Sequence, residues 1–158
     1  MSEPHISIRD LTMAYGPSVI QRDLNFDINK GDIFVIMGGS GCGKSTLLKH
    51  MLGLLDPAKG DIFYNDQSFF QASMKQQDDM RQRWGITYQS GGLFSAMTLA
   101  GNVNLPLQLY TQYSASDRED IIAYKLALVG LGGYQNYYPS EISGGMRKRA
   151  ALARAIAL

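Results

Sequence analysis

Gly38-Gly39-Ser40-Gly41-Cys42-Gly43-Lys44-Ser45 fills every fixed position of the phosphate-binding pattern G-x-x-x-x-G-K-[ST]. An unbroken apolar run, residues 33–37, enters this stretch, and good helix formers follow it from Thr46 onward. This order predicts a buried strand, a glycine-rich loop and a helix. An ordinary glycine-rich turn that matches the pattern by chance is the alternative interpretation.

The chemistry of a bound anion explains this spacing. Glycines let the backbone wrap closely around a phosphate and turn successive N–H groups inward. A helix that begins near Gly43 adds free N–H groups and the positive end of its dipole. Lys44 is expected to reach the β- and γ-phosphates, and the Ser45 hydroxyl to hold Mg²⁺. The pattern predicts ATP or GTP as the ligand, without choosing among kinases, GTPases and ATPases.

Length and composition describe a globular chain of about one domain. It has 158 residues, of which 45% are hydrophobic and 18% charged, and its net charge is +1. Such a charge argues against a broad electrostatic footprint for nucleic acid. No apolar run approaches the ~20 residues of a membrane helix, and no signal-peptide pattern is recognised. Cys42 is the single cysteine and the two histidines, His5 and His50, lack ligand spacing, so no metal is expected beyond nucleotide-bound Mg²⁺.

Hydrophobic patterns predict two kinds of sheet. Alternating apolar residues over 6–13 and 24–28 indicate two half-buried strands of an outer antiparallel sheet, which residues 61–64 rejoin. The continuous apolar run at 33–37 and the stretch 84–88 are predicted as buried strands. Tyr15, at the end of the first strand, is either a packing residue or an aromatic face for a purine.

Between the second buried run and residue 133 the pattern is first loop and then helix. Gln89 is followed by Ser90-Gly91-Gly92, so it either belongs to the loop surface or orients water and contacts Mg²⁺. Within the helical stretch 98–129, Pro106 is predicted to limit one helix, and Ser116 with Glu119 to form the capping box of the next.

Ser143-Gly144-Gly145-Met146 opens the last helix, and Arg147-Lys148-Arg149 follows directly. Ser143 is the predicted N-cap, and the two glycines permit close approach to the helix terminus. Three cations in the first turn oppose the helix dipole, at a cost of a few tenths to ~1 kcal/mol. They form either a solvated basic edge or a site where a ligand or partner supplies an anion.

Together these landmarks resemble the ATP-binding subunits of ABC transporters over essentially the whole chain. The resemblance implies an α/β fold: a P-loop NTPase (RecA-like) core with an antiparallel β subdomain, over about 1–94, and a helical signature subdomain, over about 95–158, together one ABC ATPase domain. It assigns Tyr15 to adenine stacking, Gln89 to the Q-loop and Ser143, Gly144, Gly145 and Met146 to the signature sequence. The Walker A loop is assigned to Gly38, Gly39, Ser40, Gly41, Cys42, Gly43, Lys44, Ser45 and Thr46.

The resemblance also implies ATP and Mg²⁺ as cofactors. Lys44 and Gln89 would then act in catalysis, and Ser45 and Gln89 at the metal. A second ATPase subunit is implied in a head-to-tail dimer, where the signature helix of one subunit closes over the γ-phosphate held by the other. Transmembrane permease subunits are implied as further partners, so the protein is expected on the cytoplasmic face of the inner membrane.

Three details point to a subfamily. Met146, where most of the family has glutamine, the following Arg147-Lys148-Arg149 and the run from Gln89 to Thr98 are similar to the Mla/Mce-type lipid-transport ATPases. Phospholipid cargo and an Mce-type substrate-binding partner are therefore expected. Two alternatives stay open: an ABC-type ATPase that acts on nucleic acid or translation, and a nucleotide-binding fragment without catalysis.

The family pattern continues past the signature helix with a Walker B strand, which carries a Mg²⁺-binding aspartate and a catalytic glutamate, and then a switch histidine. Residues 1–158 contain none of these after the signature, and His5 and His50 lie upstream of it. The sequence is therefore expected to be truncated at its C-terminus, with a core sheet short of at least one strand. These 158 residues alone are expected to bind Mg-ATP weakly at best, without turnover.

Overall fold

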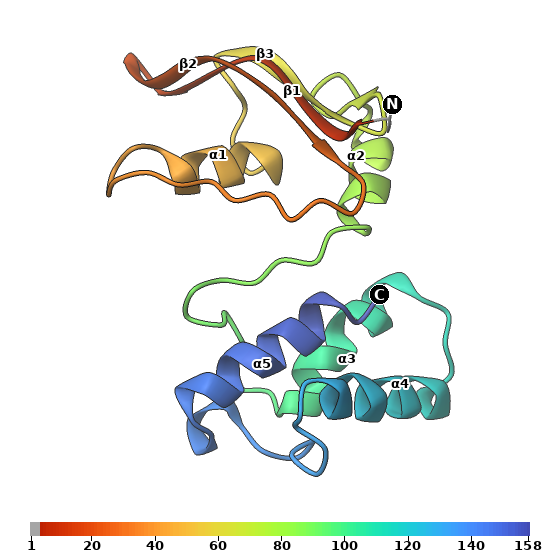
Figure 1. Cartoon of the computed structure of the whole chain (residues 1–158). Coiled ribbons are helices and arrows are strands. Elements are labelled where there is room, and N and C mark those ends of the chain that lie inside the picture. Colours follow the sequence, from red (N-terminus) through yellow and green to blue (C-terminus); the bar gives the residue numbers. More distant parts are fainter. Residues whose placement is uncertain (1–3) are drawn as a thin grey trace. The chain divides into compact units, whose positions relative to one another are not determined.

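The computed structural model describes residues 4–158, which form two compact units, one ending at Arg81 and one covering Gln82–Leu158. Each unit has its own elements and core. The first contains β1 (Pro4–Tyr15), β2 (Ser18–Asn29), α1 (Lys44–Met51), β3 (Lys59–Tyr64), β4 (Gln67–Ser68) and α2 (Met74–Arg81). The second contains α3 (Leu99–Tyr110), α4 (Ala115–Leu128), the short 3₁₀ helix η1 (Pro139–Glu141) and α5 (Gly144–Ala155) (Figure 1).

The first unit is built on one antiparallel sheet with strand order β2-β1-β3-β4. This confirms the outer sheet predicted from the alternating residues. Helix α1 lies against one face of the sheet (Figure 1). The buried Tyr64 hydroxyl on β3 donates a hydrogen bond to the Met51 carbonyl at the end of α1, and burial raises the pKa of this tyrosine. The core between them is apolar and contains Ile8, Leu11, Met13, Leu47, Met51, Ile62 and Phe69.

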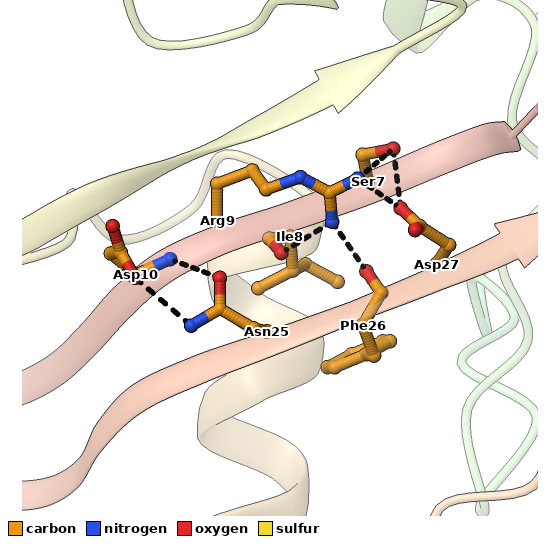
Figure 2. Close-up of polar contacts among 7 residues, drawn as sticks. All are labelled: Ser7, Ile8, Arg9, Asp10, Asn25, Phe26 and Asp27. Atoms are coloured by element: carbon orange, nitrogen blue, oxygen red, sulfur yellow. Dashed lines mark hydrogen bonds and ion pairs between the residues drawn. The ribbon is translucent and has the colours of Figure 1, made fainter.

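An irregularity at Asp10 explains why the alternation along β1 is only approximate. The β1–β2 register shifts between Ile8 and Leu11, and Asp10 has a positive φ of 49°. The Asp10 N–H donates to Asn25 Oδ1 at 2.9 Å, and Asn25 Nδ2 donates to Asp10 Oδ1 at 3.0 Å (Figure 2). This exchange holds the bulge, so Ile8 and Leu11 are both buried although a spacing of three positions would place them on opposite faces of a regular strand.

A second polar cluster joins β1 to β2 next to this bulge. Asp27 accepts hydrogen bonds from the Ser7 hydroxyl at 2.7 Å and from Arg9 Nη2 at 2.6 Å (Figure 2). These two contacts, Ser7 first, hold the pKa of Asp27 below its ordinary value of 3.8. Because Arg9 and Asp27 are both exposed, the cluster mainly fixes the pairing of the strands rather than their stability.

The two predicted buried strands are wrong for this structure. Residues 33–37 and 84–88 have no strand assignment, and Ile33, Val35 and Met37 are 95%, 67% and 85% exposed. A strand exists only where a neighbouring strand completes its hydrogen bonds, and the sheet of the described residues includes neither run. Within this run, the Phe34 ring stacks on Phe26 of β2 at a centroid distance of 5.2 Å.

The second unit is a helical bundle around a core contributed by α3, α4 and α5 (Figure 1). Helix α4 buries one face, because Ile122 and Leu126 lie in this core. The predicted limit at Pro106 is wrong, since that residue lies inside α3. Proline removes its own N–H from the helical ladder and crowds the carbonyl four residues earlier, but α3 tolerates both and continues to Tyr110.

The capping box of α4 is present, but two residues earlier than predicted. Ser114 is the N-cap, and its hydroxyl accepts from the Asp117 N–H, while the Asp117 carboxylate accepts from the Ser114 N–H at 3.1 Å. Ser116 lies within the helix and cannot cap it, because an N-cap residue needs extended backbone angles, which Ser114 has (φ −61°, ψ 165°). The sequence thus predicted the type of cap correctly but placed it two residues too late.

Candidate nucleotide-binding site

The glycine-rich loop from Gly38 to Gly43 leads directly into α1. Gly43 is the N-cap of that helix and has a φ of 99°, a conformation that favours glycine. A Cβ at Gly43 would lie 2.7 Å from Ile20 Cγ2, and one at Gly38 would lie 2.6 Å from Cys42 Sγ. These two glycines are therefore required by the shape of the loop, which a side chain at either position would fill.

Lys44 folds its side chain back over this loop. Its Nζ donates to the carbonyls of Gly38 and Gly39 at 2.8 and 2.7 Å and lies 3.6 Å from Cys42 Sγ. The ammonium is thus centred on the loop at the start of the helix, where a phosphate would meet it. A phosphate arriving here would compete with these carbonyls, and a charge-assisted bond to its oxygens is the stronger kind.

No side chain caps the start of α1, so the helix terminus offers backbone donors. The Ser45 side chain is exposed there, in the first turn. Free N–H groups, the positive end of the dipole and an ammonium together form a site for an anion. The hydroxyl of Ser45 is a suitable Mg²⁺ ligand of the hard-oxygen type, with phosphate and water completing the shell. The described residues include no cluster of three or more His, Cys, Asp or Glu that would hold a metal by itself.

Contacts from β1 and β2 support the loop from behind, and sequence inspection missed them. Gln21 Nε2 donates to the Cys42 carbonyl at 3.3 Å, and Met13 Cε lies 3.3 Å from the Cβ position of Gly43. With Leu24 and Leu47, these residues line a hollow of about 190 Å³ beside the loop. No local pattern marks Gln21, because its role depends on how β2 lies over a loop twenty residues later.

Tyr15 stands at the end of β1, where it pairs with Ser18, and its side chain is 45% exposed. By strand alternation it shares a face with Met13, the residue that packs behind Gly43. Its aromatic ring is therefore accessible in the same unit as the loop. Stacking on a purine remains a prediction for this residue.

Gln89 and the predicted signature residues belong to the second unit. Gln89 is exposed in a turn. Ser143 is the N-cap of α5, and its hydroxyl accepts from the Met146 N–H at 3.2 Å, which confirms the predicted cap. Around Gly144 and Gly145 the space is open, since Cβ atoms there would have no neighbour closer than 3.6 and 4.0 Å. The roles of all these residues toward a nucleotide remain predictions.

Two of the three cations at the start of α5, Arg147 and Arg149, have partners within their own unit. Arg147 Nη1 donates to the carbonyls of Pro139 and Ile142 at 3.3 and 2.9 Å. Arg149 Nη1 donates to those of Val129 and Gly130, at the C-terminal end of α4, at 3.0 and 3.1 Å. The positive charge of Arg149 thus meets the negative end of another helix dipole. An external anion is not needed to explain these two residues.

Comparison with known proteins identifies the family. The sequence profile of the ABC transporter family matches residues 21–158. The chain belongs to the ABC transporter family. Among curated ABC proteins, it is 43% identical over 153 residues to the probable ribonucleotide transport ATP-binding protein mkl of Mycobacterium leprae. It is 42% identical over 158 residues to the intermembrane phospholipid transport system ATP-binding protein MlaF of Haemophilus influenzae.

The shared segment is only part of each relative. It covers 97% of this chain and 44% of the mycobacterial protein, and 100% of this chain and 60% of the Haemophilus protein. The chain therefore spans about half the length of the curated ABC relatives that it matches.

A solved ABC structure confirms the fold class. The dimeric post-hydrolysis state of the ATP-binding cassette MJ0796, bound to ADP and Pi, matches with a TM-score of 0.86 and 28% identity, over 96% of this chain and 69% of that one. The fold is thus that of an ABC cassette with a P-loop NTPase core. No helix among the described residues is long and apolar enough to cross a membrane.

Proposed function

We propose that this chain is the nucleotide-binding part of a subunit that hydrolyses ATP to drive an ABC transporter. The observation that carries the proposal is the Lys44 ammonium, held by the Gly38 and Gly39 carbonyls at the uncapped start of α1. Lys44 contacts the β- and γ-phosphates, and the loop N–H groups enclose them. Tyr15 stacks on the adenine at the end of β1.

Magnesium would be held by the Ser45 hydroxyl together with Gln89. When bound, the ion neutralises charge that develops on the phosphates during transfer to water. Within this chain, Lys44 supplies a fixed charge and Gln89 orients the attacking water. Positioning and charge stabilisation account for most of phosphoryl-transfer catalysis, so these two residues are the ones proposed to act in it.

The subunit is proposed to act as a head-to-tail dimer, in which Ser143, Gly144, Gly145 and Met146 meet the nucleotide of the partner. The open space around the two glycines supports this, because a phosphate can approach the backbone there without meeting a side chain. The matching cassette MJ0796 is described as dimeric and bound to ADP and Pi. Permease subunits would anchor the dimer to the inner face of the inner membrane.

Phospholipid is the proposed cargo, with an Mce-type protein as a further partner. The support is the relative named as an intermembrane phospholipid transport ATP-binding protein, at 42% identity. A ribonucleotide is the second candidate, because a relative at 43% identity is named as a probable ribonucleotide transport protein. The phosphate-binding loop does not distinguish phospholipid from ribonucleotide cargo, since it would contact only the nucleotide that powers transport.

The test uses the full-length protein assembled with its permease in vesicles. We expect ATP-dependent transfer of labelled phospholipid between vesicles, and no transfer with Lys44→Ala. ATP-driven ribonucleotide uptake without lipid transfer would instead support the second candidate. Turnover that depends on added nucleic acid, or ATP binding without turnover, would contradict a transport role.

Cys42 offers a direct test of nucleotide occupancy. It lies in the loop, is partly buried, and contacts the Lys44 ammonium through its sulfur. Bound Mg-ATP should cover this thiol and slow its reaction with a maleimide. Labelling at the same rate with and without Mg-ATP would contradict this position of the nucleotide.

A further inference from the structure

The Ser143 N-cap of α5 lies between two peptide groups that are both held by Arg147. Arg147 Nη1 donates to the Ile142 carbonyl at 2.9 Å, and the Arg147 N–H donates to the Ser143 carbonyl at 2.9 Å. The first carbonyl belongs to the peptide group before the Ser143 Cα, and the second to the peptide group after it. A rotation of either group would change one backbone angle of Ser143. Both angles, φ −68° and ψ 162°, are therefore fixed by one residue of the first turn of α5.

The guanidinium of Arg147 also reaches back to the short helix η1. Its Nη1 makes a second hydrogen bond, at 3.3 Å, to the carbonyl of Pro139, the first residue of η1. Pro139 and Ile142 are both buried. Buried backbone carbonyls normally have a donor, and a charged donor makes the stronger kind of hydrogen bond. Arg147 therefore joins η1 to the first turn of α5 across the segment that carries Ser143.

Met146 holds the same turn through an apolar contact. Its side chain is partly buried and packs against the core of the second unit. Its N–H donates to the Ser143 hydroxyl oxygen at 3.2 Å. These contacts do not use the Ser143 hydroxyl proton or the N–H groups of Gly144 and Gly145, and the first N–H groups of a helix have no intrahelical acceptor. The turn thus keeps donors in fixed positions, and serine and backbone supply them.

We propose that Arg147 is a positioning residue for the signature sequence, which holds Ser143 and the first turn of α5 in the shape that receives the partner subunit's nucleotide. The inference rests on the proposed function, in which this turn meets that nucleotide. Arg147 acts through Ser143 and supplies no charge to the phosphate, because its guanidinium is directed at carbonyls of its own subunit. Donors that are already in place stabilise the transition state of phosphoryl transfer without reorganisation at the moment of reaction.

Hydrogen exchange of the full-length protein without nucleotide tests the positioning itself. In Arg147→Ala, exchange of the Met146 amide should rise roughly tenfold, because Ser143 loses the side-chain donor that fixes one of its peptide groups and its cap bond opens more often. Arg149→Ala is the matched control, since it removes the same charge from the same helix together with two comparable bonds to carbonyls at the end of α4. In this control, exchange of the Met146 amide should stay within about twofold of the parent.

Kinetics of the full-length protein with its permease test the consequence for catalysis. Arg147→Ala should lower the kcat for ATP hydrolysis roughly ten- to a hundredfold, while KM for ATP changes less than about twofold, because Tyr15 and the glycine-rich loop are untouched. Arg147→Lys should be nearly as impaired, because it keeps the positive charge but lacks the longer, forked group that reaches both carbonyls. Arg149→Ala should keep kcat within about twofold of the parent.

The outcomes separate this inference from the proposed function. Unchanged exchange of the Met146 amide in Arg147→Ala would overturn the inference, and so would faster exchange with an unchanged kcat per folded molecule. A normal kcat in Arg147→Lys would also overturn it, since charge alone would then suffice. Absence of turnover in the parent assembly would contradict the proposed function itself, and the exchange of the Met146 amide would then decide the positioning role.

A second variant covers a failure to fold. If Arg147→Ala does not fold, both quantities are measured in Arg147→Lys, and normal exchange or a normal kcat in that variant would overturn the inference.

Discussion

Helices α1 and α5 both begin in glycine-rich, basic sequence, yet their N-termini are built in opposite ways. At α1 the N-cap is Gly43, no side chain caps the helix, and the following lysine turns back over the loop. At α5 the Ser143 hydroxyl caps the helix, and Arg147 and Arg149 turn away to carbonyl groups of other segments. Similar composition therefore produces an uncapped helix start open to an anion at α1, and a helix start capped by a side chain at α5.

The difference shows what distinguishes a built phosphate site from a basic helix end. Free N–H groups and an ammonium must point at the same place, which requires a helix start without a side-chain cap and a lysine that turns back over it. At the start of α5, the Ser143 hydroxyl already accepts from one of these N–H groups. In the proposed function, the backbone at the start of α5 and Ser143 would contact a phosphate that a partner subunit holds. The following predictions test this contrast.

Gly43→Ala should have the largest effect. The new Cβ would be forced into a positive φ and against Ile20 at 2.7 Å. Strain and overpacking together should lower the free energy of unfolding by about 3 kcal/mol and abolish ATP binding. Gly41→Ala is the control, since its φ is 81° but no atom lies within 4 Å, and it should cost only about half as much. Thermal or denaturant unfolding measures the free energy of unfolding of both variants. Equal losses in Gly43→Ala and Gly41→Ala would show that the contact with Ile20 of β2 does not contribute.

Lys44→Ala should weaken ATP binding roughly ten- to a hundredfold, because charge-assisted hydrogen bonds contribute about 1.5 to 3 kcal/mol. Isothermal titration with Mg-ATP measures the change. Lys49→Ala, in the last turn of α1, and Arg147→Ala, at the start of α5, should leave the affinity of a single subunit unchanged. Equal affinity of Lys44→Ala and the parent would remove this lysine from the site.

Ser143→Ala should lower the free energy of unfolding by about 1 kcal/mol, since it removes the cap of α5. Ser45→Ala at the uncapped helix should change it by less than about 0.5 kcal/mol. Urea unfolding of both variants beside the parent measures this difference. If Ser45→Ala lowered the free energy of unfolding more than Ser143→Ala, the proposed difference between the uncapped α1 and the capped α5 would be contradicted.

Lowering the pH should reduce the stability that the capping box of α4 contributes. It should hardly affect the start of α1, whose first turn has no acidic residue. Hydrogen bonds from the Ser114 hydroxyl and then from its N–H hold the pKa of Asp117 below its ordinary value of 3.8. The carboxylate therefore stabilises the folded state above pH 3.8, and this contribution is lost as pH falls through the lower folded pKa. The stability difference between parent and Asp117→Ala should shrink below that pH, and a constant difference would exclude a role for ionisation.

The glycine-rich loop, the N-cap of α5 and the outer sheet could be predicted because their causes are local. The pattern from Gly38 to Ser45 specifies glycines where the backbone turns sharply and a lysine one residue into the helix. Ser143 caps a helix three residues away through its own hydroxyl. Alternation along β2 marks one face of a strand. The family also followed from the order of these landmarks, and the match to the ABC transporter family over residues 21–158 confirms it.

Other features were decided only by the tertiary structure, because their partners lie far along the chain. The apolar run at 33–37 has the composition of a strand, but a strand forms only where another segment completes its ladder. The sequence left open whether the basic residues of α5 form a solvated edge or an anion site. In the structure, Arg149 donates to the Val129 carbonyl at the end of α4, twenty residues upstream. Asn102 looks like any polar helix residue in sequence, and only folding brings its amide against Phe94 and Thr98. Hydrogen-bond partners across such distances leave no periodic trace, so no local pattern could reveal them.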